Sequence, residues 1–363
     1  MSPGPAIPDP ALLDDVAARR RLDPADMAGA IAGLPAQLRG AAGRLEEIRL
    51  PAGASAATGA TVFGMGGSAI GADLVRESFA VRLDRPVSIV RGRAAPGWVR
   101  PGSLVVAVSH SGRTAETLQA AEAAVRAGAP IVAITAGGPI AGLVEAAGGS
   151  VVRYPGSGQP RASVGHLAGS LAGVLAAAGF LPGVAMAAEL EAAAAAAEAQ
   201  IARNGPDVAT EDNAAKRLAA RLVDRLPVVV GAEHLAPVAR RWKTQLNENA
   251  ETWAAFEEIP ELLHNGVVGF GTPAWSPERL FAIILAGTAD AAFLADRRAV
   301  VRDGLAAVGT PVEEVVLPGL PPLAQAFAGV AFGDLVSLYL ALLRGVDPTP
   351  VRAIEALKVR LAG

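Results

Sequence analysis

Short apolar runs that alternate with helical stretches are the feature of this sequence that most constrains its fold. Five such runs lie in the first half of the chain: ATVFGM, PVSIV, SLVVAVS, PIVAIT and SVVRY. Each has the length and β-branched content of a strand. Helical candidates separate them, at Ala69–Val81, Ala115–Ala127 and Ala141–Ala147. Continuous apolar strands that alternate with helices predict a parallel sheet covered on both faces.

The same pattern restarts near the middle of the chain, which predicts a second α/β lobe. Its strands are LPVVVG, LFAIILAG and PVEEVVL, and a last helix is expected from about Pro350 to Leu361. The intervening stretch from Gly183 to Arg225 is rich in Ala, Glu and Arg and reads as helical. A chain of 363 residues suits two lobes. We therefore predict N-terminal helices plus a first domain over 1–183, a helical connector over 184–225 and a second domain over 226–363.

The composition narrows the classes of function. Hydrophobic residues make up 52% of the chain, enough for a large core, and the net charge is −3 without a basic tract, which argues against nucleic acid as a partner. There is no cysteine, which excludes disulfides, thiolate catalysis and zinc–thiolate sites. The N-terminus lacks the pattern of a signal peptide, and apolar runs carry polar breaks. We therefore expect a cytoplasmic protein without membrane contact.

A glycine-rich turn follows the first predicted strand and opens a helix, reading GMGGSAIG from Gly64 to Gly71. Such a turn directs backbone N–H groups and the positive end of a helix toward an anion. Read loosely, it also fits a dinucleotide fingerprint, which needs an acidic residue at the end of the next strand. That strand, Val87–Val90, ends instead in Arg91. A nicotinamide site is therefore disfavoured, and a tight turn that binds nothing stays open as an alternative.

A second turn carries three hydroxyl side chains, Ser109, Ser111 and Thr114, directly after the strand Val105–Val108. In open α/β sheets, ligands bind at the carboxyl ends of strands, where these hydroxyls can surround a phosphate. The alternative is that Ser111 and Thr114 only cap the following helix. Because a cap needs one hydroxyl, two anion-type turns after two strands favour phosphate binding.

Several stretches together resemble one protein family. GMGGSAIGADL and SHSGRTAETL resemble the paired phosphate-binding loops of the sugar isomerase (SIS) domain. Further stretches are similar to the bifunctional phosphoglucose/phosphomannose isomerase family: VRGRAAPGWV, PRASVGHL, NENAETWAAFEEIPELLHNGVVGF and GVDPTPVRAIEALK. The resemblance runs from about residue 60 to the C-terminus. It implies an α/β protein of two SIS-type doubly wound lobes, with parallel sheets flanked by helices, that forms a homodimer.

The resemblance also implies a reaction and the residues that carry it. The reaction is the interconversion of glucose 6-phosphate and/or mannose 6-phosphate with fructose 6-phosphate, through an enediolate and without cofactor or metal. The phosphate of this hexose 6-phosphate would be bound by Gly67, Ser68, Ser109, Ser111 and Thr114. The catalytic residues would be Arg161, Glu248, His264 and Lys358.

The chemistry of an aldose–ketose isomerase suits these residue types. A carboxylate such as Glu248 serves as the base that moves a proton between C2 and C1. A fixed cation such as Arg161 stabilises the developing oxyanion, and His264 with Lys358 can transfer protons during ring opening. Each also has a purely structural alternative: an exposed helix glutamate, a helix-start arginine, a histidine bonded within a turn and a solvated lysine.

The match departs from the family pattern at five positions. The serine loop has His110, Arg113 and Ala115 where the family usually has Tyr, Asn and Glu, and Glu251 and Gly266 replace residues that tend to be Lys and Glu. Two alternatives therefore stay open: a non-catalytic SIS module that binds or senses a sugar phosphate, and a related SIS enzyme such as a ketose-phosphate or amino-sugar isomerase. No pair among the four histidines has the i, i+4 spacing of a helical zinc site, which argues against a metal-dependent isomerase.

Overall fold

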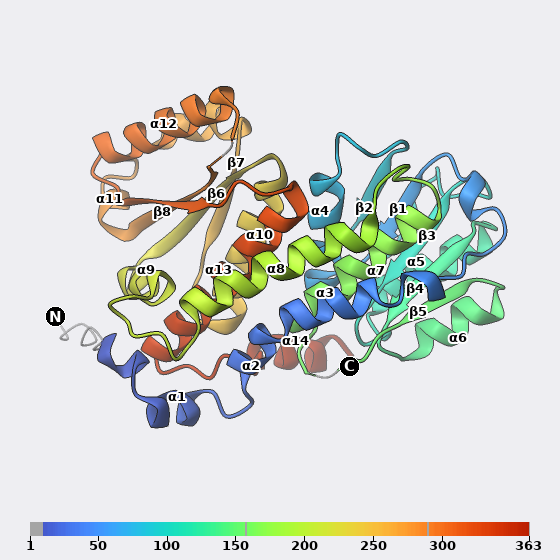
Figure 1. Cartoon of the computed structure of the whole chain (residues 1–363), viewed down its shortest axis with the longest axis horizontal. Helices are drawn as coiled ribbons and strands as arrows, with labels where there is room; N and C mark the ends of the chain where they lie inside the picture. The colour runs from blue at the N-terminus through green and yellow to red at the C-terminus, as the bar shows by residue number, and fades with distance from the viewer. Residues whose placement is uncertain (1–9, 157, 289, 363) are drawn as a thin grey trace. The chain divides into compact units, whose positions relative to one another are not determined.

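The computed structural model describes residues 10–156, 158–288 and 290–362 (Figure 1). The chain packs as two compact units. One, the N-terminal-sheet unit, comprises Gly33–Ala196 and Pro321–Ala326; the other, the C-terminal-sheet unit, comprises Met1–Ala32, Ala197–Leu320 and Phe327–Gly363. Each contains one parallel sheet with flanking helices, so the predicted fold class is confirmed.

The sheet of the N-terminal-sheet unit has the strand order β2-β1-β3-β4-β5, and every pairing is parallel. Its strands match the five predicted apolar runs: β1 (Ala60–Phe63), β2 (Val87–Val90), β3 (Leu104–Val108), β4 (Ile131–Thr135) and β5 (Ser150–Arg153). The central strands β1, β3 and β4 are buried along their whole length, as their unbroken apolar sequences require.

Helices cover this sheet and carry its connections. They are α3 (Leu34–Ala42), α4 (Gly66–Ser78), α5 (Ala115–Arg126), α6 (Pro139–Ala146), α7 (Val164–Ala177) and, as far as Ala196, α8 (Met186–Asn204), with short 3-10 turns η2 (Leu45–Glu47), η3 (Ala54–Ala56) and η4 (Pro160–Ser163). Buried residues of α5 and α6 pack with β1, β3 and β4 in one hydrophobic cluster. Another layer forms where α7 packs against both α3 and α4.

The strand order places a topological switch point between β1 and β3. The chain leaves β1 toward β2 on one side and leaves β3 toward β4 on the other. The two strands are level, because Phe63 pairs with Ala107 one residue before β3 ends. The glycine turn and the serine loop therefore emerge side by side, at the place where open α/β sheets bind ligands.

The C-terminal-sheet unit holds the parallel sheet β7-β6-β8-β9. Its strands are β6 (Leu226–Ala232), β7 (Ala255–Ile259), β8 (Leu280–Gly287) and β9 (Val312–Leu317). Its helices and turns are η1 (Pro10–Leu13), α1 (Val16–Leu22), α2 (Met27–Ala32), α9 (Ala214–Leu222), η5 (Glu233–Leu235), α10 (Ala236–Asn249), η6 (Glu261–His264), η7 (Gly266–Gly269), α11 (Ser276–Arg279), α12 (Ala292–Ala307), α13 (Pro322–Leu343) and α14 (Arg352–Ala362). One hydrophobic cluster joins β6 and β8 to α12 and η6.

Two details of the fold go beyond the sequence-based expectations. The predicted helical stretch 183–225 holds two helices with a break between them, because α8 ends at Asn204 and α9 begins at Ala214. Pro206 lacks the N–H that a continuing helix requires, and the side chain of Asn213 caps α9 by accepting a bond from the N–H of Lys216. The edge strand β7 was not predicted, since its sequence AFEEI carries too few apolar residues to read as a buried strand.

The long helix α13 lies in the C-terminal-sheet unit from Phe327 onward. It is the one helix within 10–156, 158–288 and 290–362 that is long and apolar enough to cross a membrane, and its most apolar stretch is completely buried inside the protein. Burial on all sides is the property of a core helix.

Candidate active site

The glycine turn lets the chain pass very close to its neighbours. A Cβ atom on Gly64 would lie 3.2 Å from the carbonyl oxygen of Val108, at the end of β3, and one on Gly67 would lie 3.1 Å from the Cα of Arg161. Met65 occupies the N-cap position of α4 and forms no side-chain cap bond. The N–H of Ser68 donates to the carbonyl of Met65 over 3.0 Å, and the N–H groups of Gly66 and Gly67 have no side-chain cap and can face an anion. Arg91 forms an ion pair with Asp73 of α4, at the place where a dinucleotide fold needs an acidic residue.

The hydroxyls of the two turns form a local network. The Oγ of Ser109 lies 3.1 Å from the Oγ1 of Thr114, and Ser68 accepts a bond of 3.4 Å from the N–H of His110. Ser68 and Ser109 are buried, whereas Ser111 is exposed. Thr114 occupies the N-cap position of α5 but forms no cap bond there. The capping alternative therefore does not hold for Thr114, whose hydroxyl meets Ser109 instead.

A neighbouring loop fixes the backbone of the serine loop. Gly112 has a positive φ of 62°, and a Cβ on it would lie only 1.9 Å from the carbonyl oxygen of Gly137. The N–H of Ile140 donates to the carbonyl of Gly112 over 3.2 Å, and that of Ala136 donates to the carbonyl of His110 over 3.1 Å. Since only glycine tolerates both the torsion and the approach, Gly112 fixes the course of the loop.

Three ring side chains lie beside the serine loop. The Nδ1 of His110 is 2.9 Å from the hydroxyl of Tyr154, and the ring of Tyr154 stacks on that of His166 at 5.1 Å. Burial lowers the pKa of His110. Burial, together with the nearby charge of Arg44, lowers the pKa of His166 to about 4. Both rings are therefore neutral at neutral pH. His110, one of the five departures noted above, is hydrogen-bonded to Tyr154, which follows β5.

The lowered pKa of His166 predicts a loss of stability in acid. Its unfolded-state value is near 6.5, so the unfolded chain binds more protons than the folded one between pH 6.5 and 4. The stability that neutral His166 contributes is present above pH 6.5 and is lost as the pH falls toward 4. We expect urea unfolding to show a smaller loss between pH 7 and pH 5 in His166→Leu than in the unchanged protein. Equal losses in both would contradict the assignment.

Arg161 lies in η4, packed against the glycine turn. Arg161 is only 3% exposed, and its guanidinium donates to the side-chain oxygen of Gln159 over 3.2 Å. The structure thus brings Arg161 next to Gly67, in the glycine turn that also carries Ser68. Such a buried, fixed guanidinium suits the stabilisation of an anion.

Glu248 belongs to the C-terminal-sheet unit, where it is half-buried near the end of α10. It lines a cavity of about 640 Å³. One wall is formed by the end of α10 and the segment that follows it, and the other by the chain that leads into α14. The lining residues are Lys243, Thr244, Asn247, Glu248, Glu251, Thr252, Trp253, Pro350, Val351, Arg352, Ala353 and Ile354. Glu248 therefore lies in the wall of a cavity that a small molecule can enter, as a catalytic base requires.

The two asparagines that flank Glu248 hold the end of α10. Asn249 is completely buried and its side-chain amide donates to the Oγ of Ser337 in α13 over 2.9 Å. The side chain of Asn247 accepts a bond of 3.0 Å from the N–H of Ala254, the residue before β7. These bonds fix the backbone on both sides of Glu248, which gives the Asn-Glu-Asn segment a physical role.

The remaining two predicted catalytic residues lie elsewhere in the same unit. His264 is exposed at the end of η6, the turn that follows β7. Lys358 lies in α14, and its side chain falls outside the described residues. Within the described part of the chain, no group of three or more His, Cys, Asp or Glu residues could hold a metal ion. The roles of His264 and Lys358 stay predictions.

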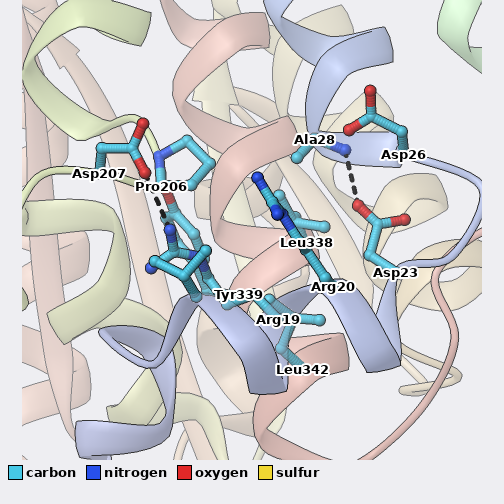
Figure 2. A pocket seen from close by; sticks show the side chains of 11 residues that line it. Arg19, Arg20, Asp23, Asp26, Ala28, Pro206, Asp207, Leu338, Tyr339 and Leu342 are labelled. Carbon is cyan, nitrogen blue, oxygen red and sulfur yellow. Dashed lines mark hydrogen bonds and ion pairs between the residues drawn. The ribbon is translucent and has the colours of Figure 1, made fainter.

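A second pocket in the C-terminal-sheet unit contains none of the predicted site residues. Figure 2 shows it between α1, α2 and α13, with Arg19 paired to Asp207 at 2.9 Å and Asp23 accepting a bond from the N–H of Ala28. Its volume is about 210 Å³. Arg19 and Asp207 form an ion pair, and Asp23 and Asp26 accept bonds from N–H groups of α2, so we assign the pocket no part in the site.

Comparison with protein families finds two matching models. The "SIS domain" family matches residues 60–143, which include both hydroxyl-bearing turns. The "Bacterial phospho-glucose isomerase C-terminal SIS domain" family matches residues 211–361, which include Glu248 and His264. Each of the two sheets thus falls largely within one of the two matches.

Individual proteins extend the similarity over most of the chain. The chain is 34% identical to a bifunctional phosphoglucose/phosphomannose isomerase of Caldicellulosiruptor bescii, over 83% of this chain and 88% of that protein. It is 32% identical to one of Thermoplasma acidophilum, over 83% and 89%. Among solved structures, a hypothetical protein from Thermus thermophilus has the same fold, with a TM-score of 0.71, 21% identity and coverage of 97% and 95%.

Proposed function

The chain belongs to the bifunctional phosphoglucose/phosphomannose isomerase family, and on that premise we propose that it interconverts glucose 6-phosphate and mannose 6-phosphate with fructose 6-phosphate. The observation that carries the proposal is the cluster of Ser68, Ser109 and Thr114 hydroxyls at the switch point of the first sheet. A sugar phosphate is the ligand whose oxygens such a cluster complements.

In this proposal the N-terminal-sheet unit holds the phosphate. The uncapped first turns of α4 and α5 offer N–H donors, and Gly67, Ser68, Ser109, Ser111 and Thr114 offer further donors. Arg161 supplies a fixed positive charge that stabilises the negative charge developing on the enediolate oxygen. Because this guanidinium is buried and its turn is packed against Gly67, it needs little reorganisation when charge develops.

Glu248 is the proposed base that carries the proton between C2 and C1. The same proton can return to either carbon, so one carboxylate serves both directions of the reaction. His264 and Lys358 are assigned the proton transfers that open the sugar ring. No step of this scheme draws on a cofactor or metal.

We also propose that the protein is a cytoplasmic homodimer. The family resemblance supports the dimer, and the exposed position of His264 is compatible with a role near a second copy. The non-catalytic alternative, a module that senses a sugar phosphate, draws its support from Arg113, which is exposed on the serine loop, and from Gly266.

A coupled assay tests the function directly. Interconversion of fructose 6-phosphate with glucose 6-phosphate and with mannose 6-phosphate is measured separately, with EDTA present. Turnover of both sugars is the expected result. Saturable binding of the sugar phosphates by folded protein without turnover of either would instead support the sensing module.

The serine loop is tested by Ser109→Ala. We expect KM for the hexose phosphate to rise about tenfold to a hundredfold with little change in kcat, because a hydrogen bond to a charged phosphate contributes about 1.5–3 kcal/mol in both ground and transition states. Steady-state kinetics measures both constants. Ser55→Ala, at an exposed serine, is the matched control and should leave KM unchanged. An unchanged KM in Ser109→Ala would place the phosphate elsewhere.

A further inference from the structure

The side chain of Gln37 bonds to the turn that carries Arg161. Its Nε2 donates to the carbonyl oxygen of Ala162 over 2.6 Å, and its Oε1 accepts a bond of 3.1 Å from the N–H of Gly165. Gln37 lies in α3, 125 residues before Ala162 in the sequence. One carboxamide thus bridges the end of η4 and the start of α7.

The side chain fits its partners in both chemistry and shape. A carboxamide offers a donor NH2 and an acceptor oxygen side by side, which is what a backbone carbonyl and a backbone N–H require. The Cβ of Gln37 approaches so closely that a Cβ on Gly165 would lie 2.9 Å from it. The side chain of Gln37 can therefore reach both backbone groups only because residue 165 is a glycine, which lets α3 and α7 approach closely.

On its other side the same turn is confined by the glycine turn. A Cβ on Gly67 would lie 3.1 Å from the Cα and 3.2 Å from the backbone nitrogen of Arg161. Arg161 is thus held between Gln37 of α3 and the start of α4, with its side chain buried. If the bonds to Gln37 are lost, the turn is free to move on the side away from Gly67.

We propose that Gln37 is a positioning residue for Arg161, which it holds at the distance that the developing oxyanion requires. The inference rests on the proposed function, in which Arg161 stabilises the enediolate. Gln37 itself contacts backbone and not substrate. A misplacement of about 1 Å in a catalytic group can cost about a hundredfold in rate, so two hydrogen bonds on this turn can control kcat.

The test is a double-mutant cycle between Gln37→Met and Arg161→Met. Methionine keeps the length of glutamine and removes both hydrogen bonds. We expect Gln37→Met to lower kcat at least tenfold while KM changes less than twofold, since the phosphate ligands are untouched. In the Arg161→Met background the same change should lower kcat less than twofold, because the group being positioned is already gone. Gln119→Met, at an exposed glutamine of α5, is the control.

The outcomes separate the two proposals. If Arg161→Met lowers kcat but Gln37→Met does not, the positioning role is wrong and the proposed function stands. If Gln37→Met lowers kcat equally in both backgrounds, it acts independently of Arg161, and the inference is again wrong. If Arg161→Met keeps full kcat, the role of Arg161 under the proposed function is wrong, and the inference falls with it.

A loss of folding would be recognised separately. Thermal unfolding followed by circular dichroism gives the midpoint temperature at which each variant unfolds. Kinetics are then measured well below that temperature. Gln37→Glu is the second variant: it keeps an acceptor for the N–H of Gly165 and loses the donor to Ala162. We expect it to lower kcat with KM unchanged, and full activity in Gln37→Glu would contradict the need for that donor.

Discussion

Glu248→Gln is expected to lower kcat for both hexose phosphates by about a thousandfold or more, at the upper end of what one general base contributes. Glutamine keeps the size of the side chain and its place in the cavity wall but cannot accept the C2 proton. The affinity for the phosphate group should stay within about twofold, because the serine loop is unchanged. Stopped assays measure kcat, and calorimetric titration with 6-phosphogluconate measures binding.

The control for this variant is Glu251→Gln, which removes the same charge from the wall of the same cavity. It should keep kcat within about threefold if Glu248 acts as a base and not through the charge of the cavity. Full turnover in Glu248→Gln would remove the base assignment. Equal large losses in both variants would show that the cavity needs negative charge and no particular base.

Asp334→Leu is expected to destabilise the C-terminal-sheet unit by about 3–5 kcal/mol, because it leaves the guanidinium of Arg241 buried without its carboxylate. Asp334 of α13 and Arg241 of α10 are 6% and 1% exposed, and their closest atoms lie 2.6 Å apart. A second bond of 3.2 Å makes the contact bidentate. Urea unfolding followed by circular dichroism measures the change.

Two further variants separate this explanation from a general loss of packing. Arg241→Met combined with Asp334→Leu removes both charges and should recover most of the lost stability, since well-packed apolar groups often replace a buried ion pair without cost. Glu145→Leu breaks a pair with Arg153 in which both side chains are 53% exposed, and should change stability by less than about 1 kcal/mol. Failure of the double variant to recover would mean that shape, and not charge, dominates at this position.

The sheet and its ligand-binding edge could be predicted from the sequence because they depend on local patterns. Unbroken apolar runs predicted the strands of the first sheet, and the turns after β1 and β3 were marked by glycines and hydroxyls. What the sequence could not decide was whether Thr114 caps its helix or faces a neighbour. The hydroxyl of Ser109 lies beside that of Thr114 only because β3 packs against β4 and the serine loop bonds to the loop after β4.

Other features depend on partners far away in the sequence, and no local pattern reveals them. Gln37 is one polar residue in an amphipathic helix, and its partners lie more than a hundred positions away. Tyr154 carried a weak signal, since it directly follows β5 and so stands at the carboxyl end of a strand. The roles of Glu248, His264 and Lys358 came from the family resemblance, and they stay predictions until variants are measured.

The buried ion pair of α13 also bears on which solvent this helix can occupy. Pro322–Leu343 matches a bilayer span in its length and apolar character. Asp334 lies near its middle, where placing a carboxylate in a bilayer costs about 2.5–3.5 kcal/mol. The carboxylate that binds Arg241 in the folded protein thus makes the same helix less suited to lipid than to the protein core.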